Sequence, residues 1–431
     1  MTAIVTPPFA PACTPVFAPE TLRRQPWQAR LFHWFFTRPE WLLRPLRCIR
    51  PFVGIGGTLF VLRHDDVREV LARDDVFAVP FGRRIAAVDR SGQNFILGMD
   101  SADPRYRPEL ARLMRVMPHA DLPRLGAEAR DSADAALRRA GPEFDIVGGL
   151  FTPTTTHIVA RYFGVAASDL ALWAMALSNW IFATPYGAKP AGEAVARQAA
   201  LAAGAALGTV TDAAIAEAVS GTHAHDTLAA RLVRDVLAGT PAASLADVQD
   251  AVRPVLDSLI TAFVPNCTVA ATNILGVLLD RPDIQARCRA IAADGDDAAL
   301  GRALMEAFRF RPLFPGPTRI CGQDYVLAAD APHARRIRAG TMVLACCQSA
   351  MFDADRIDRP HHFDPDRAAS DSLLFGYGLH GCIGTALAST QLVNIFRPLL
   401  LGPRFRRVAG ARGRMAYFGA FPEHLIIRFD R

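Results

Sequence analysis

The stretch Leu373-Leu-Phe-Gly-Tyr-Gly-Leu-His-Gly-Cys-Ile-Gly-Thr-Ala-Leu-Ala388 decides how the rest of the chain is interpreted. Glycine adopts backbone angles that other residues resist, so Gly376 and Gly378 predict a tight turn. Gly384 precedes an apolar run with helical spacing, which predicts that a helix begins just after Cys382. Amide groups at a helix start point at such a sulfur, and the helix dipole favours negative charge. The position would therefore stabilise a thiolate, the form in which cysteine binds haem iron.

Most free cysteines are small buried apolar side chains, and Cys382 taken alone would fit that interpretation. The longer pattern Phe-Gly-x-Gly-x-His-x-Cys-x-Gly, from Phe375 to Gly384, is far more restrictive. It resembles the haem-binding loop of the cytochrome P450 superfamily at every defining position. The resemblance implies haem b (iron protoporphyrin IX) as the cofactor and Cys382 as the ligand of its iron. It also implies that Phe375, Gly376 and His380 contact the haem.

Two further segments follow the order of the same family. Glu306-Ala-Phe-Arg309 places a glutamate and an arginine three residues apart on one helix face, and Phe363-Asp-Pro-Asp-Arg367 follows it. A lone Glu-x-x-Arg is usually a surface ion pair. The resemblance implies instead a buried network of Glu306, Arg309 and Arg367, which shapes the protein around the cysteine and is structural.

The segment Leu313-Phe-Pro-Gly-Pro-Thr-Arg319 lies between these motifs. It resembles the family's strand that lines the substrate pocket and offers an arginine to a haem propionate. By its position, the resemblance implies that Arg319 binds that propionate. Leu313, Phe314 and Pro315 would face the substrate, which implies an apolar ligand.

The first half of the chain matches the family more loosely. In the family, an Asp-Pro turn leads into a helix whose histidine and arginine, four residues apart, hold haem propionates. Here the turn starts at Asp103, the histidine position is Arg107, and the arginine position is Ala111, with Arg112 one residue later. Arg107 can still bind a propionate because guanidinium pairs well with carboxylate. Arg112 is equally consistent with an ordinary surface arginine, so the choice between the two stays open.

The run from Leu245 to Leu279 is the longest helical pattern, and it ends shortly before Pro282. We expect Pro254 to divide it, because proline lacks the amide that the helix needs. In the family this helix crosses the haem and carries an Ala-Gly-x-Asp/Glu-Thr motif that delivers protons for the oxygen chemistry. Counted back sixteen residues from the closing proline, the motif maps onto Ala262-Phe-Val-Pro-Asn266.

This motif departs from the family's pattern at three positions. Phe263 replaces the glycine, Pro265 replaces the acid and Asn266 replaces the alcohol. An amide is neither acid nor base at neutral pH, but Asn266 can hydrogen-bond a peroxide oxygen or orient a substrate. Pro265 cannot donate to the carbonyl of Thr261, so we expect a kink that leaves this carbonyl free. The sequence thus predicts Pro265 and Asn266 at the catalytic position, with Ala262 and Phe263 in the substrate pocket.

Three functions fit these residues. The first is a monooxygenase that hydroxylates an apolar small molecule of the lipid, terpenoid or secondary-metabolite type, with electrons from a ferredoxin and ferredoxin reductase. The second is an isomerase, dehydratase or peroxygenase that acts on a fatty-acid hydroperoxide or endoperoxide and needs no electrons. The third is a haem sensor or carrier without turnover. The predominance of monooxygenases in the superfamily places the first slightly ahead.

Length and composition set the remaining expectations. A chain of 431 residues would by default form two domains. The resemblance implies instead one cytochrome P450-type haem domain, mainly α with small β-sheets (α+β), over residues 51–431. Residues 1–50 would form an N-terminal extension that packs on the core.

Charge and cysteine usage exclude several classes of protein. The net charge of +6 comes from scattered arginine, since Lys189 is the only lysine, so nucleic acid is a poor candidate partner. The eight cysteines show neither a Cys-x-x-Cys pair nor zinc spacing, which indicates a reducing compartment. We expect a cytoplasmic bacterial monomer without a signal peptide or a transmembrane segment.

Overall fold

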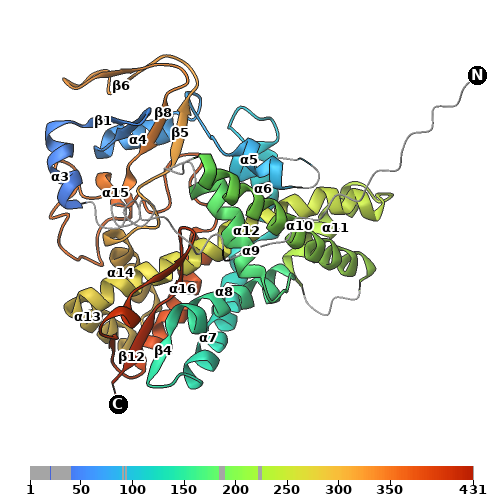
Figure 1. Ribbon diagram of the computed structural model, residues 1–431. Helices are drawn as coiled ribbons and strands as arrows, with labels where there is room; N and C mark the ends of the chain where they lie inside the picture. The colour runs from blue at the N-terminus through green and yellow to red at the C-terminus, as the bar shows by residue number, and fades with distance from the viewer. Residues whose placement is uncertain are drawn as a thin grey trace, which may run out of the picture.

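The computed structural model describes residues 20, 40–89, 92, 95–183, 190–221 and 226–430. Most of the N-terminal extension and Lys189 therefore lie outside the described residues. Helices make up most of the described chain, with short strands gathered into small sheets (Figure 1), which confirms the predicted fold class.

The helices divide into a long central one and a surrounding set. The described α-helices are α3 (Glu40–Ile49), α4 (His64–Ala72), α5 (Gly82–Val88), α6 (Tyr106–Val116), α7 (Leu122–Arg138), α8 (Thr152–Ile158), α9 (Leu170–Ser178), α10 (Pro190–Ser220), α11 (Leu228–Gly239), α12 (Leu245–Asp280), α13 (Pro282–Asp294), α14 (Asp297–Phe310), α15 (Cys347–Ala350) and α16 (Thr385–Leu401). Three π-helical segments, η3 (Val147–Phe151), η4 (Val159–Phe163) and η5 (Asn179–Ala183), extend or join them, and short 3-10 turns complete the set.

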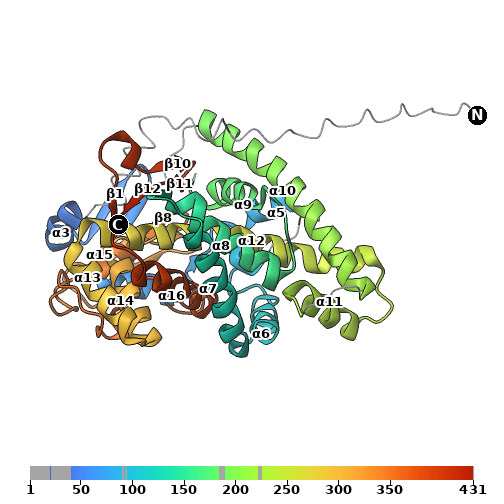
Figure 2. The same cartoon turned by 90° about the horizontal axis from the view of Figure 1, so that it is seen from below.

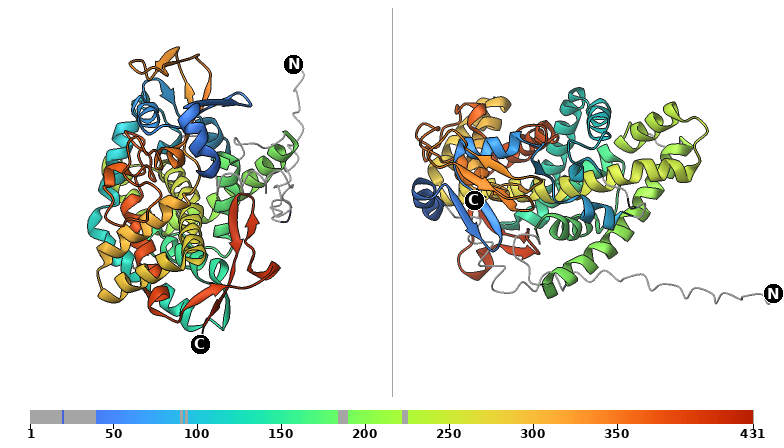
Figure 3. Two further views of the ribbon diagram at one scale, coloured as in Figure 1. Left: turned by 90° about the vertical axis from the view of Figure 1, so that its left-hand side faces the viewer. Right: turned by 90° about the horizontal axis from the view of Figure 1, so that it is seen from above.

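The strands of the described chain form one larger sheet and several smaller ones. They are β1 (Phe52–Ile55), β2 (Thr58–Val61), β3 (Phe77–Ala78), β4 (Glu143–Asp145), β5 (Thr318–Cys321), β6 (Tyr325–Leu327), β7 (Arg335–Ile337), β8 (Met342–Ala345), β9 (Phe405–Arg407), β10 (Ala416–Phe418), β11 (Phe421–His424) and β12 (Ile426–Phe429). The larger sheet has the order β1-β2-β8-β5-β3, with β2 and β8 parallel. The red C-terminal strands lie at one edge of the molecule (Figure 3), where β12 pairs with β4 and β9.

Helix α12 passes through the middle of the molecule (Figure 2). A capping box starts it, since the Ser244 side chain accepts from the Asp247 amide and the Asp247 carboxylate accepts from the Ser244 amide. The helix then continues unbroken through two internal prolines, Pro254 and Pro265. The expectation that Pro254 divides it is therefore wrong. Both prolines are buried among neighbouring helices, and this packing offsets the hydrogen bond that each one removes.

Two helices in the described part of the chain are long and apolar enough to cross a membrane by length and composition. They are Gly192–Ser220, within α10, and α12. In α12, 78% of the most apolar window is buried inside the protein, against 56% in the other helix. A helix that is apolar on all sides is typical of a protein core, and the burial of α12 is of that kind.

A group of charged side chains joins α12 to α10. The Asp257 carboxylate accepts from the Thr211 hydroxyl at 2.6 Å, and Arg253 donates to Asp212 at 2.6 Å. Burial, aided by the negative charges of Asp89 and Asp212, raises the pKa of Asp257 to about 7. The hydroxyl of Thr211 and the positive charge of Arg253 oppose this rise. Asp257 is thus partly protonated near neutral pH.

We expect Asp257→Asn to flatten the pH dependence of stability. The pKa of Asp257 is higher in the folded state than its ordinary value of 3.8, so its contribution is fully present below that value and is lost as pH rises through about 7. The loss amounts to at most about 1.4 kcal/mol per pH unit. Urea unfolding at a series of pH values across this window would measure it, with the exposed Asp430→Asn as control. Parallel curves for wild type and Asp257→Asn would contradict the assignment.

Candidate functional site

The cysteine loop has the turn that the sequence predicts. Gly376 and Gly378 have φ angles of 76° and 74°, in the left-handed region that favours glycine. At Gly378 a Cβ atom would lie 2.7 Å from the carbonyl oxygen of Leu71, so a side chain has no room there. The Cys382 amide donates to the carbonyl of Phe375 at 2.8 Å and closes the loop. Helix α16 begins at Thr385, which confirms the predicted helix start.

The sulfur of Cys382 lies where donors converge. Burial raises the pKa of its thiol, whereas hydrogen bonds from the Gly384 amide and the Thr385 hydroxyl lower it. Since a hydroxyl carries one hydrogen, Thr385 can donate either to the sulfur or to the carbonyl of Cys382, which lies 2.8 Å from it. Although protein surrounds Cys382, its side chain still exposes surface. It is therefore available as a ligand, and the two donors favour its anionic form.

Helix α12 presents a partly accessible face opposite the cysteine loop. Between Leu259 and Leu278 this helix is buried except at Ala262, Phe263, Asn266 and Asn273. Spacings of three and four place these residues on one side of the helix. Pro265, predicted at the catalytic position, is buried, so its effect would have to act through the backbone.

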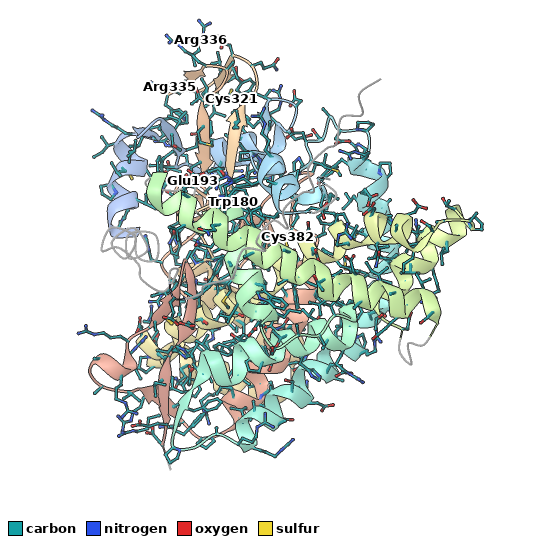
Figure 4. All side chains as sticks on the ribbon, turned by 45° about the vertical axis from the view of Figure 1, so that its right-hand side comes forward. Trp180, Glu193, Cys321, Arg335, Arg336 and Cys382 are labelled. Carbon is teal, nitrogen blue, oxygen red and sulfur yellow. The ribbon has the colours of Figure 1, made fainter. Side chains whose placement is uncertain are left out.

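The neighbouring Cys267 shows that the two walls face each other. Burial, and then the nearby Cys382, raise the pKa of the Cys267 thiol. An electrostatic effect of one sulfur on another requires that they lie close together. The centre of α12 thus lies across from the cysteine loop, and Figure 4 shows Cys382 near the middle of the molecule.

Several apolar side chains of α12, the cysteine loop and nearby segments belong to one packed region. They are partly accessible but pack against the main core cluster: Phe263, Leu313, Leu379, Ile383, Leu387 and Ala420. The ring of Phe263 lies 5.4 Å from that of Phe163 in η4, which fixes its direction. Phe314 is 44% exposed, and Pro315 is buried with its carbonyl accepting from Gln348. Of the three predicted substrate contacts on this segment, only Leu313 packs against the same core cluster as Phe263, and all three stay predictions.

Polar groups gather at the edge of the cysteine loop. Burial, and then the positive charge of Arg319, lower the pKa of His380, so these two predicted propionate ligands lie close together. Arg319 is itself buried on β5. The ring of Tyr106 packs edge-on against His380 with 4.8 Å between centroids, and its hydroxyl donates to the Leu379 carbonyl at 3.0 Å. Sequence reasoning missed Tyr106, for which the only signal was an aromatic residue at a polar helix start.

The two arginines on α6 that the sequence offered have different surroundings. Arg112 donates to Asp235 of α11 at 2.8 Å and lies 3.6 Å from Glu109. These carboxylates hold Arg112 against α11. Arg107 is exposed, one residue after the buried Tyr106. Because Arg112 is engaged by these carboxylates, Arg107 is the better candidate on this helix and remains its predicted propionate ligand.

The predicted charge network lies together on the other side of the loop. Arg309 makes two hydrogen bonds of 2.8 Å to Glu306, and both side chains are almost fully buried. Arg367 donates to the same carboxylate at 3.3 Å, and the Asp364 amide does so at 3.1 Å. Arg309 also donates to the Met351 carbonyl at 3.0 Å. The network thus fastens the segment before the cysteine loop to α14.

Helices α5 and α10 and the turn between β10 and β11 meet at η5. Arg84 of α5 donates to the Trp180 carbonyl at 2.5 Å and to the Glu193 carboxylate of α10 at 2.6 Å. The Asn179 side chain accepts from the Ala420 amide at 3.1 Å, in the turn between β10 and β11. Figure 4 shows Trp180 and Glu193 near each other, at the junction of α9 and α10. Four segments distant in sequence are thus held together at η5.

These residues fit a haem group. The donor set at Cys382 suits a thiolate ligand, the facing walls are apolar, and a buried arginine lies at one edge, where a propionate would need a positive charge.

Comparison with known proteins gives the same class. The family model described as Cytochrome P450 matches residues 298–405. Erythromycin C-12 hydroxylase of Saccharopolyspora erythraea is 30% identical over 362 residues, which cover 78% of this chain and 79% of that protein. A mutant of P450 EryK in complex with erythromycin B has 25% identity and a TM-score of 0.71, over 93% of this chain and 96% of that one.

The chain therefore belongs to the cytochrome P450 superfamily. The match to the cytochrome P450 YjiB of Bacillus subtilis, 30% identical over 138 residues, spans only 32% of that protein and 32% of this chain. The region that the family model matches contains both the Glu306 motif and Cys382, whereas α12 lies before it.

Proposed function

We propose that this chain is a haem-thiolate monooxygenase that hydroxylates an apolar small molecule of the lipid, terpenoid or secondary-metabolite type. The observation that carries the proposal is Cys382, which has the Gly384 amide and the Thr385 hydroxyl as neighbouring donors, together with the partly accessible side of α12 at Phe263 and Asn266. Haem bound there would supply the chemistry that activates oxygen. The protein's part is to hold the thiolate with Gly384 and Thr385, to exclude water with its apolar lining and to orient the substrate.

Hydroxylase relatives support this reading. The relatives include an erythromycin C-12 hydroxylase, so a macrolide-like or other secondary-metabolite substrate is consistent with the family. The lining side chains Phe263, Leu379 and Ile383 are apolar and would favour such a ligand through burial of its surface. We place the protein in the bacterial cytoplasm as a monomer.

A monooxygenase needs electrons, for which we propose a ferredoxin and its reductase. A groove of about 1030 Å³ lies beside the cysteine loop and reaches Phe375 and Gly376. Its lining is mainly apolar, with Leu122, Met305 and Val393 among the contributing side chains. At its rim, Arg130 pairs with Asp297 at 3.2 Å. Such a groove offers a docking surface that ends at the loop carrying the thiolate.

A second candidate is a peroxide-using isomerase, dehydratase or peroxygenase. The observation that favours it is Asn266, which occupies the accessible face of α12 where the family has an alcohol. The same face carries no acid, since no Asp or Glu occurs between Leu259 and Leu278. A peroxide is oxygen that is already reduced by two electrons. An enzyme that uses it therefore does not need the acid-and-alcohol relay that delivers protons to bound oxygen in the family. Asn266 would donate its amide hydrogen to the peroxide oxygen. A haem carrier without turnover is the third candidate.

We expect one experiment to separate these candidates. The purified ferric protein is mixed with a fatty-acid hydroperoxide under strict anaerobiosis and without reductant, and peroxide loss and products are followed. Rearranged or hydroxylated product would establish peroxide chemistry. An inert mixture, with turnover of an apolar ligand restored by ferredoxin, reductase and oxygen, would establish the monooxygenase. If neither condition gives product, the haem carrier without turnover is the remaining candidate.

If peroxide chemistry is found, Asn266→Ala should lower its rate by on the order of 100-fold, the usual cost of losing one donor at a reacting oxygen. Asn273→Ala is the matched control, since Asn273 lies on the same face but donates to the Pro312 carbonyl at 3.0 Å. Equal rates for Asn266→Ala and wild type would contradict the role given to Asn266.

A further inference from the structure

We propose that Tyr106 is the positioning residue that holds the cysteine loop in its haem-binding form, acting through Leu379 and His380. The inference rests on the proposed haem site. Neither the sequence motif nor the charge network around Glu306 includes this residue, which lies on a helix from the other half of the chain.

Tyr106 restrains two successive residues of the loop. It is the first residue of α6 and only 3% exposed. Its hydroxyl donates to the carbonyl of Leu379 at 3.0 Å, which fixes the backbone three residues before Cys382. Its ring meets the imidazole of His380 edge-on, with 4.8 Å between centroids and 64° between planes. One side chain therefore fixes both the loop backbone and the direction of the histidine.

Other restraints on the loop are internal or come from α4, where Arg68 donates to the Tyr377 hydroxyl at 2.7 Å. The Cys382 amide donates to Phe375 at 2.8 Å, and the Gly381 amide donates to Gly378 at 3.1 Å. These bonds define the shape of the loop but not its position relative to α6. Tyr106 supplies a side-chain bond from outside the loop. Burial raises the pKa of Tyr106, so its hydroxyl stays protonated and can donate at neutral pH.

A shift of the loop would change the surroundings of the sulfur. The donors to Cys382 are the Gly384 amide and the Thr385 hydroxyl, directly after the loop. Hydrogen bonds to a ligating sulfur and the orientation of neighbouring groups set the reduction potential of the iron. Weaker donation to the thiolate leaves it more electron-rich, which favours the ferric state and lowers the potential.

The test compares two buried tyrosines whose hydroxyls each donate one hydrogen bond. Tyr106→Phe removes only the hydroxyl, and we expect haem release to apomyoglobin to become about fivefold faster. We also expect a lower midpoint potential. Tyr162→Phe is the matched control, because Tyr162 is equally buried and donates to Asp121 at 2.8 Å, away from the loop. Tyr162→Phe should lower the free energy of unfolding without changing the rate of haem release or the midpoint potential.

Each outcome has one meaning. Release rate and potential changed in Tyr106→Phe but not in Tyr162→Phe would support the positioning role. Wild-type values in Tyr106→Phe, or equal changes in both variants, would overturn it, since a general loss of stability would then explain the effect. If the wild-type protein binds no haem through a thiolate, the proposed function itself fails, and this is seen before any variant is compared.

Discussion

Cys382→Ser is expected to abolish the absorption band that carbon monoxide gives with a ferrous, thiolate-ligated haem. Serine has nearly the shape of cysteine, but its hydroxyl stays protonated at neutral pH and is a poor ligand for iron. The donors from Gly384 and Thr385 lower the pKa of a thiol. Their effect cannot bring a serine hydroxyl within reach of neutral pH. The loss should therefore be complete, and a difference spectrum of the reduced protein measures it directly.

Two further cysteine variants control for this result. Cys48→Ser changes an exposed thiol on α3, and Cys288→Ser changes a buried one on α13. Burial raises the pKa of Cys288 to about 12, so it stays a neutral thiol and is unsuited to bind iron. Both variants should keep the thiolate spectrum. A Cys382→Ser protein that keeps it would show that the iron ligand has been misassigned.

Glu306→Gln is expected to destabilise the fold by about 3–5 kcal/mol, which is the usual cost of breaking a buried ion pair from one side. The Glu306 carboxylate accepts from Arg309, Arg367 and the Asp364 amide. Glutamine keeps the shape but removes the charge, so Arg309, which is 1% exposed, would be left without its anion. The Asp430→Asn variant breaks an exposed pair with Arg406 and should cost at most about 1 kcal/mol.

Urea unfolding of the haem-loaded proteins would measure both variants. Glu306→Gln should also bind less haem at equal protein concentration, because Arg309 fastens the Met351 carbonyl and hence the segment that leads to the cysteine loop. A loss of stability no greater than that of Asp430→Asn would show that Glu306 and Arg309 contribute little net energy to this fold.

Local features of the chain were largely predictable. The turn at Gly376 and Gly378 requires left-handed backbone angles, and glycine alone adopts them without strain. The start of α16 follows from the apolar spacing after Gly384. The pairing of Glu306 with Arg309 follows from their separation by three residues on one helix. In each case the interacting atoms lie within a few residues, so the order of the amino acids is sufficient.

Other features needed the contacts of distant segments. Pro254 was expected to end a helix, but burial among neighbouring helices keeps α12 continuous. We expected Phe314 beside the substrate, and its side chain is 44% exposed. Its direction depends on the path of the chain between α14 and β5, which the packing of these two elements sets. The ion pair of Arg112 with Asp235, which favours Arg107 as the propionate ligand, joins two helices far apart in the chain.

The sequence by itself determined the class of protein and the structure of the loop that carries the proposed iron ligand, because these depend on backbone angles and short spacings. The tertiary structure decided which face of α12 is accessible and that Tyr106, rather than its neighbour Arg107, packs against His380. Residues 106 and 380 lie on segments far apart in the chain. The direction of a side chain at the first turn of a helix is set by the rotation of that helix, and only packing against the rest of the molecule fixes that rotation.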